Sequence, residues 1–101
     1  MDIQKFITTA KKKNYSIIKK GDLEKLLSKS QVIIENDTHI SDKIRLLKFK
    51  DELILQEKST KGEYLIRMMK TKKEAEDFIR DRLEIYNRMW DGCGCKVKYY
   101  G

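Results

Sequence analysis

The sequence predicts an α+β domain, built from an antiparallel β-meander of about four to five strands with a long C-terminal helix packed on one face. Residues 44–70 contain three β-favouring runs separated by short polar breaks, which is the pattern of a meander. Residues 72–90 carry apolar side chains at helical spacing. Because the chain of 101 residues has no proline and no linker-like tract, we expect residues 1–101 to form a single domain.

Shorter elements are expected before the meander. Two helices are indicated by apolar residues at helical spacing, and Asp22 is placed to cap the second helix. A brief extended segment lies between them, within residues 14–21, and residues 31–36 form a β-rich run. The apolar positions are Ile3, Phe6, Ile7 and Ala10 in the first helix, and Leu23, Leu26 and Leu27 in the second. We expect both helices to lie beside the long helix or over the second face of the sheet.

Within the meander, alternation along each strand assigns the apolar residues to two faces. One face is expected to form the centre of the core, with Leu47, Phe49, Leu53, Leu55, Tyr64, Ile66 and Met68. The opposite face then carries Leu46, Ile54, Leu65 and Met69. Because these residues are also apolar, that face must be covered as well, by a second layer of the chain or by a partner.

The start of the helix over residues 72–90 is well marked. Thr71 and Glu74 have capping-box spacing, in which the threonine oxygen accepts from the Glu74 amide and the glutamate accepts from the Thr71 amide. Two i, i+4 ion pairs are expected on the polar face, Glu76 with Arg80 and Glu84 with Arg88. The apolar face consists of Ala75, Phe78, Ile79, Leu83, Ile85, Tyr86, Met89 and Trp90. Packing of this face on the sheet outweighs the ion pairs, which contribute about 0.3–0.5 kcal/mol each.

A last strand is expected after this helix. Gly92 suits the left-handed conformation that ends helices, and Gly94 allows a second change of direction. Residues 95–100 then resume a β-like pattern, which predicts a strand at the edge of the meander. Its lysines would discourage pairing with other chains.

A winged-helix-like N-terminal part is the alternative fold. The order of elements fits, with a third helix beginning near Ser30 and a wing formed by the hairpin over residues 44–58. The recognition segment would then be residues 31–41. That segment is β-branched, is interrupted by Asn36 and Asp37, and has no arginine or lysine to reach phosphates or bases.

The net charge of +7 comes mainly from the N-terminal part. Residues 1–29 carry eight lysines and three acidic residues, which is a net charge of +5. Lysines can bind the phosphates of a nucleic acid, although they lack the planar fork of arginine. The candidate nucleic-acid-binding residues are Lys11, Lys12, Lys13, Lys19 and Lys20. The competing interpretation is a solvated basic surface.

Cys93 and Cys95 are the only cysteines. A closed zinc site needs four ligands and His39 is the single histidine, so a metal site here would need thiolates from two subunits. Such a shared site would bind zinc or an iron–sulfur cluster, whereas a monomer is expected to hold no cofactor. The alternatives are a labile disulfide in a thiol redox role and a glycine turn with two small residues.

No constellation typical of catalysis occurs in the sequence, since His39 has no nucleophile or acid at a recognisable spacing. We therefore expect a small non-enzymatic interaction module that binds a protein partner or a second copy of itself through the sheet. A nucleic acid is the alternative partner. No run of about 18 uncharged apolar residues and no secretion signal occurs, and cysteines are few, so we expect no membrane partner and a cytoplasmic location.

Overall fold

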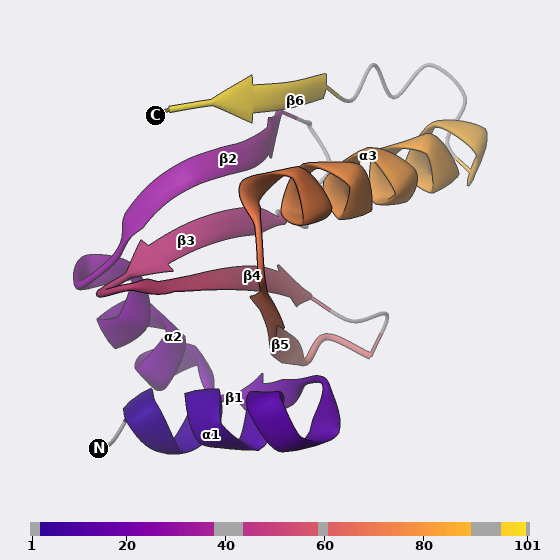
Figure 1. Cartoon of the computed structure of the whole chain (residues 1–101). Coiled ribbons are helices and arrows are strands. Elements are labelled where there is room, and N and C mark those ends of the chain that lie inside the picture. The colour runs from indigo at the N-terminus through magenta and orange to yellow at the C-terminus, as the bar shows by residue number, and fades with distance from the viewer. Residues whose placement is uncertain (1–2, 38–43, 59–60, 90–95, 101) are drawn as a thin grey trace.

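A computed structural model describes residues 3–37, 44–58, 61–89 and 96–100, in which six strands form one antiparallel sheet accompanied by three helices (Figure 1). The elements in chain order are α1 (Ile3–Lys13), β1 (Ser16–Ile18), α2 (Lys20–Ser28), β2 (Gln31–Asp37), β3 (Arg45–Phe49), β4 (Glu52–Lys58), β5 (Tyr64–Met69), α3 (Lys72–Met89) and β6 (Lys96–Tyr99). This arrangement confirms the α+β class. The sheet has more strands than expected because the short β1 segment also joins it.

The sheet is a meander extended at both sides. Its strand order is β1-β5-β4-β3-β2-β6, so β2 to β5 are consecutive antiparallel neighbours. β1 pairs with β5, and β6 pairs with β2. The strands from the two ends of the chain therefore form the two edges, with β6 at the top of Figure 1 and β1 at the bottom beside α1. The edge position expected for the last strand is confirmed.

Helices cover both faces of the central strands. α1 and α2 pack on one face, where the core includes Leu47 and Ile54. α3 packs on the other face, where the core includes Leu46, Leu55 and Ile79. Leu46 and Leu47 are adjacent, and both are 0% exposed, yet they belong to different cores. The face expected to need a second layer, which carries Leu46 and Met69, is covered by α3, whereas the N-terminal helices cover the face that was predicted to be the centre of the core.

The faces predicted for the core residues were right in β3 and β5 and wrong in β4. The residues that share the α1 and α2 face as expected are Leu47, Phe49, Tyr64, Ile66 and Met68. Leu53 and Leu55 instead lie on the α3 face, and Ile54 takes their place. The hairpin register sets Ile54 directly opposite Leu47, and residues that are directly opposite share a face. Because β4 is apolar on both faces, alternation within it did not indicate which face is which.

The N-terminal part differs from prediction at the start of α2. This helix begins at Lys20, so Asp22 lies in its first turn and does not cap it. Lys19 occupies the N-cap position and makes no side-chain capping hydrogen bond. Residues 31–37 form strand β2, paired with β3 and β6, so the winged-helix alternative, which requires a helix there, is wrong.

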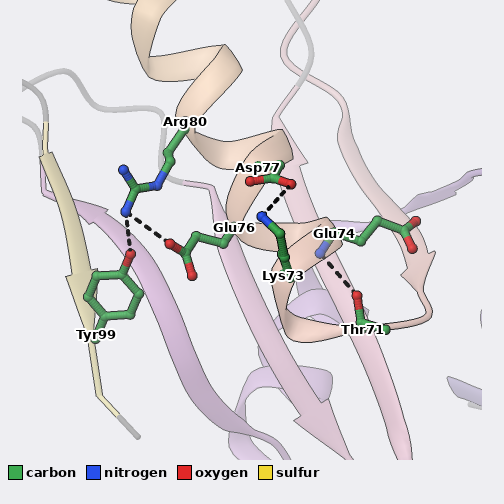
Figure 2. Close-up of polar contacts among 7 residues, drawn as sticks. All are labelled: Thr71, Lys73, Glu74, Glu76, Asp77, Arg80 and Tyr99. Carbon is green, nitrogen blue, oxygen red and sulfur yellow. Dashed lines mark hydrogen bonds and ion pairs between the residues drawn. The ribbon is translucent and has the colours of Figure 1, made fainter.

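Of the two hydrogen bonds expected in the capping box at the start of α3, one is formed as predicted and the other has a different donor (Figure 2). The Glu74 amide donates to Thr71 Oγ1 over 3.1 Å, as predicted. The Glu74 carboxylate accepts from the Lys70 amide at 3.4 Å, one residue before the expected donor. The helix start is therefore fixed mainly by the threonine.

The outer face of α3 carries the predicted ion pairs. Arg80 contacts Glu76 at 2.9 Å, and Arg88 contacts Glu84 at 2.6 Å. Both pairs are exposed enough to contribute little to stability. None of the helices in the described ranges combines the length and the apolar content needed to cross a bilayer.

Candidate functional site

The two cysteines proposed as metal ligands, Cys93 and Cys95, lie outside the described residues, as does His39. Within the described ranges, no group of three or more histidine, cysteine or acidic side chains is arranged to hold a metal ion. A site shared between two subunits therefore stays a prediction from the sequence.

The candidate nucleic-acid-binding lysines form two exposed groups. Lys11, Lys12 and Lys13 end α1, whereas Lys19 and Lys20 begin α2. β1 lies between the groups, and its three residues span roughly 10 Å at about 3.3 Å per residue. Lys11 Nζ is 2.7 Å from Glu52 Oε1, so part of its charge is compensated. The structure thus places these lysines at the two ends of β1.

Two hollows open on the α1 and α2 side of the described chain. One, of about 580 Å³, lies between the end of α1 and the β4 and β5 strands, and the Lys11–Glu52 ion pair is part of its lining. The other, of about 320 Å³, lies between α2 and the sheet and is lined by Arg45, Gln56 and Tyr64 among others. The described residues of neither lining include a serine, a cysteine or a histidine.

Large apolar side chains are exposed in three places on the described surface. Tyr15 and Ile17, at and within β1, are 45% and 49% exposed. Ile85 on α3 is 44% exposed. Tyr99 and Tyr100, at the end of β6, are 46% and 52% exposed. The side chains near β6 and those near β1 make different kinds of contacts with the rest of the protein.

The tyrosines of β6 hold the edge strand in place. The Tyr99 hydroxyl accepts a hydrogen bond of 3.0 Å from Arg80, which also contacts Glu76 (Figure 2). The pKa of Glu76 is lowered from its ordinary value, mainly by hydrogen bonding of its carboxylate with the Tyr99 hydroxyl and next by the Arg80 guanidinium. The Tyr100 amide donates to Ile33 at 2.8 Å. Tyr99 and Tyr100 therefore have bonds that explain their positions at this edge.

The residues at the β1 edge form a different kind of surface. Ile17 lies directly opposite Leu65 of β5, so both point to the α3 side of the sheet. The Arg67 guanidinium lies 5.7 Å from the centre of the Tyr15 ring and 5.6 Å from that of Phe78 on α3. Ile85 is seven residues after Phe78, on the same side of the helix. We define the β1–α3 surface as Tyr15, Ile17, Leu65, Phe78 and Ile85.

Beneath this surface lies a buried carboxylate. Glu57 is 5% exposed, and its Oε1 is 2.9 Å from Arg67 Nε. Arg82 of α3 approaches the other oxygen at 3.6 Å and lies 4.9 Å from the centre of the Phe78 ring. A buried carboxylate requires such partners, and in return it fixes both guanidinium groups. Arg67 and Arg82, which contact the aromatic rings of the surface, are thus positioned by the Glu57 carboxylate.

The sequence alone did not reveal this surface. Alternation around Ser16 places Tyr15 and Ile17 on one side, which was the available signal. The contacts with Arg67 and Phe78 depend on the pairing of β1 with β5 and on the path of α3, and no local pattern encodes either.

Comparison with known proteins finds no relative of the chain. No protein-family model matches the chain, and no curated protein or solved structure is significantly similar to it.

Proposed function

We propose that the protein is a non-enzymatic protein-interaction module and that the β1–α3 surface is its binding surface. The observation that carries the proposal is that Tyr15 and Ile17 are exposed at the β1 edge of the sheet, where Arg67 contacts both the Tyr15 ring and the Phe78 ring of α3. Both faces of the central strands are covered by helices of the chain itself. We therefore place the partner-binding site at this edge of the sheet and not on one of its faces.

The composition of the surface supports a protein partner. Tyrosine and arginine are enriched among the residues that contribute most to binding in protein interfaces. Covering the exposed half of a side chain such as Ile17 would contribute about 1 kcal/mol, since full burial is worth about 1.5–3 kcal/mol. Arg67 and Arg82 are already held by Glu57, so less side-chain entropy is lost when a partner binds.

Site-specific photo-crosslinking tests the proposal. A benzoylphenylalanine at Ile17, or in a second variant at Ile85, is activated in the native cells. The matched control carries the same group at Lys25, which is exposed on α2 over the opposite face of the sheet. We expect a discrete adduct from Ile17 and Ile85 that is absent for Lys25.

The mass of the adduct identifies the kind of partner. An adduct of twice the mass of the chain indicates self-association, and any other discrete mass indicates a different protein. No adduct at Ile17 and Ile85, or the same pattern at Lys25, would contradict the proposed surface.

A further inference from the structure

We infer that the partner binds as an extended acidic segment that adds a strand to the outer edge of β1, an inference that rests on the function proposed for the β1–α3 surface. β1 is the last strand of the sheet on its side. In the described part of the chain it pairs with β5 alone. An edge strand has backbone amides and carbonyls directed outward, and an extended peptide can hydrogen-bond to them.

The side chains at this edge suit an added strand. Alternate residues of such a strand would lie on the α3 side, next to Tyr15 and Ile17. Both are about half exposed and leave room for an apolar neighbour. On the other side of the sheet, Ser16 and Ile18 are already buried beneath the N-terminal helices. The added strand would therefore gain its apolar contacts mainly on the β1–α3 surface.

The charge around β1 indicates an acidic partner. Residues 3–21 contain six lysines and no acidic residue. Lys13 precedes β1 and Lys19 and Lys20 follow it, all exposed and without an ion pair to any residue in the described ranges. Carboxylates placed at both ends of an added strand would lie near these lysines, and their attraction would be strongest at low salt.

The same charges disfavour a second copy as the occupant. Antiparallel pairing of two β1 strands would bring the lysines of one copy next to those of the other. Lysines at an edge are a recognised means of preventing such self-pairing. A segment of opposite charge meets no such repulsion, so it is the occupant favoured by the described residues.

Synthetic peptides test the inference with the full-length protein. The probe is a fluorescent peptide of sequence DETVTVTED, and the controls are KKTVTVTKK and DETPPVTED, all measured by fluorescence anisotropy. Adjacent prolines remove amide donors from both edges of the peptide, so strand pairing would be lost while the charge is kept. We expect the acidic peptide to bind at least tenfold more tightly than either control.

Two matched variants locate the site. Lys13→Gln with Lys19→Gln should weaken the acidic peptide about fivefold, whereas Lys25→Gln with Lys29→Gln on α2 should change binding less than twofold. The peptide should also slow hydrogen exchange of the amides in residues 15–18. Equal losses for the two double variants, or equal binding of the proline peptide, would overturn the inference.

A single-stranded DNA of 12 bases serves as the polyanion control. If it bound more tightly than the acidic peptide, the inference would be overturned in favour of a nucleic-acid site. If the Ile17 crosslink formed but no acidic peptide bound, the strand addition would be excluded and the interaction surface retained. If the crosslink also failed, the proposed function would be lost as well.

Discussion

Arg67 on β5 and Glu57 on β4 are joined across the sheet by an ion pair of 2.9 Å, and the carboxylate is almost fully buried. The two residues are diagonal neighbours in the register, where Glu57 faces Leu65. Arg82 of α3 approaches the same carboxylate at 3.6 Å. One acidic side chain therefore links two strands and a helix beneath the β1–α3 surface.

Replacing Glu57 with alanine is expected to lower the free energy of unfolding by about 1–3 kcal/mol, because two partly buried guanidinium groups lose their partner. Urea unfolding followed by circular dichroism measures the change. Glu84→Ala, in an exposed pair on α3, is the matched control and should cost less than about 0.5 kcal/mol. Equal effects of the two substitutions would mean that the Glu57 contacts do not form.

Leu46→Ala and Leu47→Ala should each cost about 2–5 kcal/mol, although the two side chains point to opposite faces. Both residues are fully buried, one under α3 and the other on the α1 and α2 face. Chemical unfolding of the two variants checks this. A cost below about 1 kcal/mol for either one would show that its face is not covered by the chain.

Thr71→Ala should destabilise the protein by about 1 kcal/mol, because the Glu74 amide loses its acceptor. Thr71→Ser keeps the hydroxyl and should restore most of the loss. Glu74→Ala should cost only a few tenths of a kcal/mol in capping, since the contact of its carboxylate with the Lys70 amide is long at 3.4 Å. Thermal unfolding of the three variants tests the order, and a larger cost for Glu74→Ala than for Thr71→Ala would contradict it.

Glu76 should titrate below the ordinary glutamate pKa of 4.5, because the Tyr99 hydroxyl and then Arg80 favour its charged form. A group whose pKa is lower in the folded state stabilises the fold above its unfolded pKa. That stabilisation is lost as the pH falls through the folded pKa, so it disappears in the acidic range below pH 4.5. Carbon NMR of the side-chain carboxyl measures the titration. Tyr99→Phe should move the pKa upward, and an unchanged titration in that variant would refute the assigned cause.

Much of the fold could be predicted because its signals are local. The three runs in residues 44–70 and the helical spacing after Thr71 each lie within one element, and both predictions are confirmed. The face of β4 could not be read in this way, because Leu53, Ile54 and Leu55 are all apolar. Only the pairing of Ile54 with Leu47 resolves the ambiguity, and that pairing is a property of two strands.

The sequence was a poorer guide to the β1–α3 surface than to the fold. Tyr15 and Arg67 come together only through the antiparallel pairing of β1 with β5, which sets Ser16 opposite Ile66. A three-residue strand carries too short a pattern to specify a partner so far along the chain. The lysines were visible in the sequence, but their position at the two ends of an edge strand was not.

The sheet order has a consequence for how the molecule opens. The consecutive strands β2 to β5 form hydrogen bonds with near neighbours in the chain, whereas β1 and β6 are attached from its two ends. Either edge strand can detach without breaking a bond inside the meander, so we expect its amides to exchange through local opening of lower free energy than global unfolding. We then expect β1, which carries Ile17 and follows Tyr15, to pair with β5 late in folding. A bound segment would stabilise this pairing.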